Sequence, residues 1–270
     1  MPLPSSAIVE LHERIEAEAY RDLIDCASDE LRDKLGLEHH AIQDGTLFVC
    51  RAIDHIMFDR VVGLGMRATP QADVLDRVID IFGKNGIKNW VIQLAPGADA
   101  LAKLCDARGF LRHPRTWAIF SRECVPAQKI KTEITVREIG IAERDAFANV
   151  VARSYGVPPL ASQWAASAIG RRKWRYFCGF SGNELIACGV LYLDRGAGWL
   201  GFGATLEGHR GKKAQQAVLA ARIEAARLEG AKVLFTETGI PHEGEAGPSF
   251  KNIQRAGFRV AYERPNLRLA

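Results

Sequence analysis

The stretch that decides the fold, residues 203–230, reads GATLEGHRGKKAQQAVLAARIEAARLEG. Three cations, Arg210, Lys212 and Lys213, precede the point at which a long helix is predicted to begin. The first turn of a helix carries partial positive charge, because its N–H groups have no partners. Helix starts therefore favour Asp, Glu or Ser over cations. Cations at this point predict that the turn binds an external negative charge.

A strand, a glycine-containing turn and a helix start together form a typical anion site. The N–H groups of such a turn point inward, and the helix dipole adds positive potential. Added cations suit a ligand that carries several phosphates. The alternative is a solvated basic turn, because exposed Lys and Arg are common and cost little.

The chain around this stretch shows one series of elements. A three-strand meander over residues 174–206 precedes it, with compact turns at SGNE and DRGAG. The other elements predicted here are a strand at 134–140, a helix at 142–156, a short helix containing Trp164, a strand at 231–238, a helix at 248–258 and a strand at 259–264.

An earlier series precedes a polar segment at 125–133, which we interpret as a linker. Helical spacing of apolar residues and a closing Gly86 predict a helix over 71–86. The other predicted elements are helices at 9–25 and 98–110 and strands at 46–52, 58–65, 88–96 and 115–123.

The two series repeat three landmarks in the same order, which indicates a duplication. The landmarks are Gly63-Leu64-Gly65 with Gly201-Phe202-Gly203, the helix residues around Leu75 with those around Leu219, and Gly109-Phe110 with Gly257-Phe258. The interval from Gly65 to Leu75 is ten residues, whereas that from Gly203 to Leu219 is sixteen. The cation cluster is thus an addition to the second half, and we predict no cofactor site in the first.

The segment Gly208–Leu219, GHRGKKAQQAVL, resembles the acetyl-CoA pyrophosphate loop of the GNAT superfamily of N-acetyltransferases. That loop commonly reads Arg/Gln-x-x-Gly-x-Gly/Ala before a long helix, and the order of the surrounding elements also matches. The resemblance implies an α/β (α+β) fold with two GNAT-like domains, each a mixed, mostly antiparallel twisted sheet flanked by helices. We place a degenerate domain at 1–124, the linker at 125–133 and an acetyltransferase domain at 134–270.

The resemblance also implies a set of cofactor contacts. Ala204 and Thr205 would end the strand that binds the pantetheine arm, and the amides from Gly211 through Lys212, Lys213 and Ala214 to Gln215 would hold the pyrophosphate. Arg210 would add a charged contact, and Asn252 and Arg255 lie where relatives often contact the cofactor. Two positions depart from the motif, because Lys213 stands where the family usually has Gly, and Gln215 where it has Gly or Ala.

Acyl transfer needs a neutral amine held against the thioester, a base and an acid for the departing thiolate. Relatives often carry a Tyr four residues before the Gly of the last Gly-Phe pair, where this chain has Ile253. Glu237 and Tyr262 are the substitutes we select, as base and proton donor. A solvated carboxylate and a packed strand tyrosine are the respective alternatives. Tyr192 and His242 are further, weaker candidates.

Composition narrows the class of protein. The 270 residues carry a net charge of +4, too mild for a nucleic-acid binder. No apolar run is long enough for a membrane span, and the start lacks the pattern of a signal peptide. The six cysteines are scattered beside apolar residues, which is typical of reduced thiols and predicts a cytoplasmic protein.

Two functions fit the sequence. The first is an N-acetyltransferase that uses acetyl-CoA as acyl donor, has its active site in the second half, and acts on a small amine rather than a protein. The second is a non-catalytic GNAT-like module that binds acyl-CoA or a partner, and it rests on the residues found at positions 213, 215 and 253. The sequence leaves the acceptor amine and the oligomeric state open.

Overall fold

The computed structural model describes residues 6–243, 245 and 247–270. Its contacts divide the chain into two compact units. The N-terminal unit contains Met1–Ile119, Thr238–Ile240 and Val260–Ala270, and the C-terminal unit contains Phe120–Glu237 and Pro241–Arg259. The last strand therefore groups with the N-terminal residues, although our sequence division placed it in the second domain.

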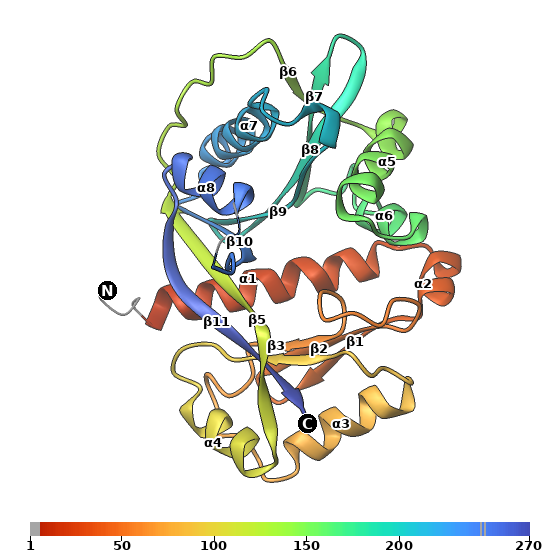
Figure 1. Ribbon diagram of the computed structural model, residues 1–270, viewed down its shortest axis with the longest axis vertical. Helices are drawn as coiled ribbons and strands as arrows, with labels where there is room; N and C mark the ends of the chain where they lie inside the picture. Colours follow the sequence, from red (N-terminus) through yellow and green to blue (C-terminus); the bar gives the residue numbers. More distant parts are fainter. Residues whose placement is uncertain (1–5, 244, 246) are drawn as a thin grey trace. The chain divides into compact units, whose positions relative to one another are not determined.

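The N-terminal unit is a sheet with helices on its two faces (Figure 1). Its hydrogen-bonded strand order is β1-β2-β3-β4-β11-β5, with β1, β2 and β3 antiparallel and β3 parallel to β4. The elements are α1 (Ser6–Asp25), α2 (Asp29–Leu35), β1 (Leu37–Ile42), β2 (Gly45–Cys50), β3 (Arg60–Val62), α3 (Val74–Lys84), β4 (Val91–Gln93), α4 (Asp99–Ala107), β5 (Phe110–Glu123) and β11 (Arg259–Leu269).

Apolar residues of α3 and α4 close one face of this sheet. Val74, Val78 and Phe82 repeat at helical spacing and are all buried in one cluster with strand residues. The Phe82 and Trp90 rings stack with their centroids 4.6 Å apart. Burial of such side chains stabilises the unit by about 1.5–3 kcal/mol each.

The C-terminal unit is built on the predicted meander. Its strand order is β10-β9-β8-β7-β6, antiparallel except for the parallel pair of β9 and β10. The elements are β6 (Thr135–Glu138), η1 (Ile141–Glu143), α5 (Arg144–Tyr155), α6 (Pro159–Ala165), β7 (Trp174–Ser181), β8 (Glu184–Asp194), β9 (Ala197–Thr205), η2 (Glu207–His209), α7 (Ala214–Leu228), β10 (Val233–Gly239) and α8 (Pro248–Arg255).

Helices cover both faces of these five strands. In Figure 1, α7 lies on one face of β7 and β8, and α5 with α6 lies on the other. The inward residues of α7 include Ala214, Val218 and Ile223, which are buried. This packing fixes the start of α7 beside the end of β9, the position that the sequence assigns to the cofactor loop.

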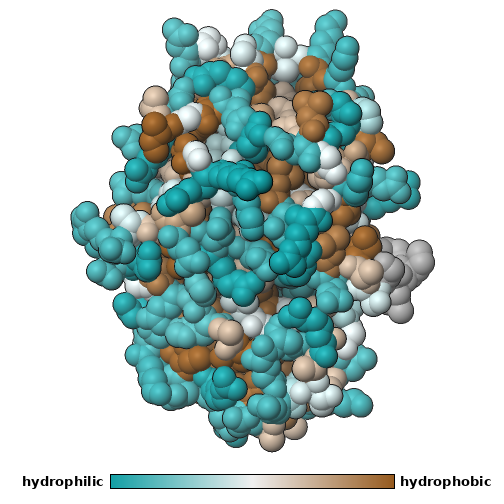
Figure 2. Space-filling view, turned by 180° about the vertical axis from the view of Figure 1, so that it is seen from behind, coloured by the Kyte–Doolittle hydropathy of each residue, from teal (hydrophilic) through white to brown (hydrophobic). Residues whose placement is uncertain are grey.

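The predicted fold class is confirmed, and most predicted elements are present. Helix α2 and strand β1 are additions that the sequence did not indicate. Residues 125–133 form neither helix nor strand and belong to the C-terminal unit. Hydrophilic residues dominate the face seen in Figure 2, with apolar residues in smaller patches between them. Among the residues described, no helix has the length and apolarity to cross a membrane.

Candidate active site

Strand β9 contains a bulge close to its end. Gly201 pairs with Val190 and Ala204 with Cys188, so that Phe202 and Gly203 together face Gly189 alone. Phe202 has a φ of 50°, in the left-handed region. A bulge re-aims the backbone groups of a strand and is common beside active sites. The registered pairing of β9 with β10 covers Ala197–Trp199, and the bulge follows it.

The predicted cofactor loop leads from this bulge into α7. Residues 207–213 form a short 3-10 turn and a glycine turn, and Gly211 has a φ of 81°. Within the described residues, the backbone N–H groups of Gly211–Gln216 have no hydrogen-bond acceptor. Gly211, Lys212 and Lys213 are exposed. A ligand arriving from solvent thus meets a row of free N–H donors at a helix start.

The corresponding loop of the N-terminal unit has its donors occupied. The carboxylate of Asp44 accepts hydrogen bonds from the amides of Gly65, Arg67 and Ala68, at 2.9, 2.7 and 3.1 Å. In the N-terminal unit, the Asp44 carboxylate thus occupies the backbone donors of the loop. In the longer loop of the C-terminal unit, the corresponding amides are free. The two loops therefore differ in whether their backbone donors are already paired within the chain.

Lys213, the residue immediately before α7, has an unfavourable backbone conformation. Its φ of 64° and ψ of 14° lie in the left-handed region, which costs a non-glycine residue roughly 1 kcal/mol. This explains why a glycine suits the equivalent motif position. This chain nevertheless has a lysine at position 213, in the left-handed conformation.

We predict that Lys213→Gly leaves the protein equally stable or stabilises it by up to about 1 kcal/mol, because glycine relieves the left-handed strain. Lys212→Gly is the control, since Lys212 has no positive φ and gains nothing from glycine. Chemical denaturation of both variants checks this. If Lys213→Gly is the less stable of the two, the strain argument is wrong.

Asn252 and Gln215, both predicted cofactor residues, meet in the structure. Asn252 Nδ2 donates to Gln215 Oε1 at 2.7 Å, and Gln216 Nε2 and Arg255 Nη1 each donate to Asn252 Oδ1 at 3.2 Å. The bonds of Asn252 to Gln215 and Gln216 join α8 to the first turn of α7. They hold the side chain of Gln215 against α8.

The remaining predicted cofactor residues lie on the same segment. Ala204 is buried, and the Thr205 hydroxyl oxygen is buried without a hydrogen-bond partner in the described part of the chain. Arg210 is exposed, and its Nη1 lies 3.9 Å from Glu207 Oε1. Ala214 is buried against the sheet as the first residue of α7. The loop and strand candidates therefore lie on one continuous segment of chain, 204–215, which contains both buried and exposed residues.

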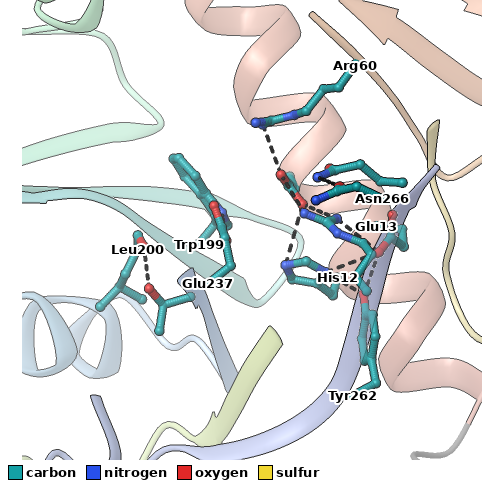
Figure 3. A network of polar contacts seen from close by, with 12 residues as sticks. His12, Glu13, Arg60, Trp199, Leu200, Glu237, Tyr262 and Asn266 are labelled. Carbon is teal, nitrogen blue, oxygen red and sulfur yellow. Dashed lines mark hydrogen bonds and ion pairs between the residues drawn. The ribbon is translucent and has the colours of Figure 1, made fainter. Parts of the chain in front are cut away.

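Glu237, the proposed base, lies on β10 beside the end of its pairing with β9. Its Oε2 accepts a hydrogen bond of 2.9 Å from the indole Nε1 of Trp199 (Figure 3). The Thr236 hydroxyl next to it donates to the carbonyl of Leu200 at 2.8 Å. Glu237 is half-buried, so its carboxylate is neither a fully solvated loop group nor sealed in the core.

Tyr262, the proposed proton donor, belongs to the N-terminal unit and not to the unit of the loop. Its hydroxyl donates to Glu13 Oε1 at 2.6 Å and lies 2.7 Å from His12 Nδ1 (Figure 3). Burial, followed by the charge of Glu13, raises the pKa of Tyr262 well above its ordinary value. The observed contacts are those of a packed strand tyrosine, and a proton-donor role remains a prediction.

Tyr262 is one member of a buried charged network in the N-terminal unit. Arg264 Nη1 donates to Glu13 Oε1 at 3.1 Å and to Glu16 Oε2 at 2.5 Å, and Arg60 Nη2 donates to Glu16 Oε1 at 3.0 Å. All four charged residues are buried. Two carboxylates and two guanidinium groups balance, which makes their burial tolerable.

Glu13 gives this network a dependence on pH. Burial alone would raise the pKa of Glu13, but the charge of Arg264 and hydrogen bonds from His12 and Tyr262 outweigh it and lower the pKa from 4.5 to about 2. Between those values the unfolded chain binds more protons than the folded one. The contribution of Glu13 to the free energy of unfolding is therefore fully present above about pH 4.5, and it is lost as the pH falls toward 2.

We predict that the free energy of unfolding, measured by urea denaturation, decreases between pH 5 and pH 3, and that Glu13→Gln flattens this slope. Comparing variant with wild type removes the opposing contribution of Asp59, whose pKa burial raises to about 7. Glu10→Gln, on the exposed surface of α1, is the control and retains the slope. An unchanged slope in Glu13→Gln would show that another group governs acid sensitivity.

Sequence reasoning missed two residues beside the bulge. Arg222 on α7 is 3% exposed and donates from Nη1 to the carbonyls of Val190 and Gly201, both at 3.1 Å. The Tyr155 hydroxyl, at the end of α5, donates to the carbonyl of Gly203 at 3.0 Å. Arg222 lies four residues after Val218 and eight after Ala214, so helical spacing places it on the inward face of α7. This spacing could have indicated from the sequence that Arg222 lies on the buried face of α7.

The comparisons with known proteins agree on the fold. The chain resembles a GCN5-related N-acetyltransferase from Kribbella flavida at 13% identity (TM-score 0.64, 86% of this chain and 88% of that one). It also resembles a GCN5-related N-acetyltransferase from Sphaerobacter thermophilus at 16% identity (TM-score 0.59, 98% and 93%). A tandem GNAT protein from the clavulanic acid biosynthesis pathway matches at 12% identity (TM-score 0.58, 83% and 77%).

No family model matches the chain, and no curated protein matches it. At identities of 12–16% the structural likenesses show the fold alone. The chain therefore has the fold of the GNAT N-acetyltransferases, as the element order around the cation cluster predicted.

Proposed function

We propose that this protein is an N-acetyltransferase that binds acetyl-CoA in its C-terminal unit and transfers the acetyl group to a small amine. The observation that carries this proposal is the row of free N–H groups from Gly211 to Gln216 at the start of α7. A diphosphate fits such a row, because its oxygens accept several hydrogen bonds and its charge is favoured by the helix dipole. Arg210 and Lys212, both exposed, add positive charge to the same turn.

The bound thioester supplies an activated acyl group. The residues of this chain supply position and charge. The β9 bulge takes backbone groups of Phe202 and Gly203 out of the regular ladder, beside the turn that we propose binds the acyl donor. Glu237, which accepts a hydrogen bond from Trp199 and is half-buried, would accept the proton that an ammonium substrate must lose.

The usual tyrosine acid has no counterpart in α8. Ile253 occupies its position and is buried. An N-acetyltransferase with this sequence must stabilise its departing thiolate by another group. Tyr262 hydrogen-bonds within the N-terminal unit, and its hydroxyl proton is held by Glu13.

The proposal is tested by titrating the full chain with acetyl-CoA in a calorimeter. We expect saturable binding, and a gain of about 2.7 kcal/mol in stability at a hundredfold excess over the dissociation constant. Acetyl-pantetheine, which lacks the diphosphate, is the matched ligand and should bind far more weakly. Equal affinity for both ligands, or no binding of acetyl-CoA, would refute the diphosphate cradle.

A non-catalytic acyl-CoA-binding module is the second candidate. Its support is the same binding surface combined with the buried Ile253 at the position of the usual acid. Thiol release from acetyl-CoA, measured across a broad panel of small amines, separates the two functions. Release that depends on one class of amine supports the enzyme, whereas binding without release supports the module.

A further inference from the structure

Arg222 is a buried cation without an ion-pair partner in the described part of the chain. Its guanidinium donates only to backbone carbonyls, those of Val190, Gly201 and Val218. Burial lowers the pKa of Arg222 to about 10, so the group stays protonated near neutral pH. A buried charge is costly unless an opposite charge compensates it. Arg222 therefore points to a negative charge that arrives from outside.

The groups that face Arg222 do not supply that charge. Cys188 on β8 is one of two titratable groups that interact with Arg222, but burial raises the pKa of its thiol to about 12, which keeps it neutral. Tyr155 on α5 is the other titratable group that interacts with Arg222, and its hydroxyl donates to the carbonyl of Gly203. Neither residue carries a carboxylate, and the positive charge of Arg222 remains uncompensated.

Two glycines leave space around the guanidinium. A Cβ on Gly189 would lie 2.5 Å from Arg222 Cζ, so a side chain there would displace the group. A Cβ on Gly203 would lie 3.5 Å from Nη2, which makes no hydrogen bond within the described residues. The free side of the guanidinium therefore faces the bulge of β9, at the residue that has no side chain to cover it.

We propose that Arg222 stabilises the thiolate that leaves during acyl transfer, in place of the acid that is missing at position 253. This inference rests on the proposed function. In the transfer, the amine nitrogen forms a bond to the acyl carbon, the carbon–sulfur bond breaks, and its electron pair remains on sulfur. The amine proton passes to the base or to solvent, and the negative sulfur is stabilised by the charge of Arg222. No proton from the protein is then required.

A purely structural role for Arg222 makes a different prediction. If the guanidinium only holds the bulge through Gly201 and Val190, its loss lowers stability and ligand affinity but leaves the acidity of a bound thiol unchanged. If it stabilises sulfur, the pKa of the thiol of bound CoA falls, because a nearby opposite charge favours the ionised form by about 1–3 pH units. The acidity of bound CoA thus distinguishes the roles without any turnover.

The experiment follows the thiolate absorbance of CoA bound to the full chain as the pH rises, with desulfo-CoA as the blank. In the wild type we expect the thiol to titrate about 1–3 pH units below its ordinary pKa of about 8.5. Arg222→Gln keeps donors for the carbonyls but removes the charge, and should restore the ordinary value. Arg222→Lys keeps the charge and should retain most of the shift. Arg175→Gln, on the surface of β7, is the control.

The outcomes separate this inference from the proposed function. Failure of CoA to bind refutes the proposed function, and with it the ground for this inference. Binding with an ordinary thiol pKa in the wild type, or with the same low pKa in Arg222→Gln, overturns the role of Arg222 alone. If Arg222→Gln does not fold, the comparison of Arg222→Lys and Gly189→Ala with wild type decides, because Gly189→Ala displaces the charge without removing it.

Discussion

Replacing Arg264 with Met lowers the free energy of unfolding by about 3–5 kcal/mol, the largest effect that we expect of one substitution. Arg264 is the shared partner of Glu13 and Glu16, and all three side chains are buried. Methionine fills a similar volume but leaves two carboxylates near each other, with one guanidinium, that of Arg60, to balance them. Either a carboxylate must take up a proton or water must enter the network.

The matched control for this prediction is Arg108→Met. Arg108 also pairs with a carboxylate, that of Asp76, but both side chains are more than half exposed, at 55% and 58%. Exposed pairs contribute about 0–1 kcal/mol, so this variant should unfold almost as the wild type does. Urea denaturation at neutral pH compares the two. Similar losses for both variants would show that burial does not set the worth of the Arg264 contacts.

The carboxylates of this network illustrate what sequence patterns leave out. Glu13 and Glu16 lie on a helix that we predicted from its amphipathic pattern, in which charged residues belong on the exposed face. They are buried because Arg264, about 250 residues away in sequence, meets them in the folded unit. No local period carries that information. The helix itself was predictable, but the burial of its charges was not.

The elements that we missed have a related cause. Helix α2 has seven residues, and β1 is an edge strand whose sequence, LEHHAI, is largely polar. An edge strand is paired on one side and does not need the apolar alternation of a central strand. The meander and α7 were predictable because their turns and spacings are local. The turn before α7 was predictable for the same reason, because its glycine and cations are adjacent in sequence, and its binding of a cofactor stays a prediction.

The candidate site divides in the same way. Residues 204–215 were chosen from one continuous stretch, which comprises the end of β9, η2 and the start of α7. Arg222 and Tyr155 reach the bulge from α7 and α5, so their role depends on packing. Glu237 and Tyr262, paired in our sequence reasoning, belong to different units. The assignment of Glu237 and Tyr262 to different units is information that the sequence did not contain.

Gln215→Glu should change stability and ligand affinity in opposite directions. A carboxylate in the first turn of α7 interacts favourably with the helix dipole and the free N–H groups, which stabilises the protein by about 0.3–1 kcal/mol. The same charge repels a diphosphate bound to the amides of Gly211–Gln216. We expect acetyl-CoA to bind at least about tenfold more weakly, a loss of roughly 1.4 kcal/mol.

The substitution is nearly isosteric, and the remaining carboxylate oxygen can still accept the hydrogen bond from Asn252. Gln163→Glu adds the same charge on α6, where Gln163 is exposed, and should leave both quantities close to their wild-type values. Calorimetric titration and thermal unfolding of the two variants provide the measurements. Loss of affinity together with loss of stability would indicate local unfolding of the loop. A new negative charge among the proposed phosphate donors must oppose a phosphate bound there. Unchanged affinity in Gln215→Glu would therefore mean that no phosphate lies at this helix start.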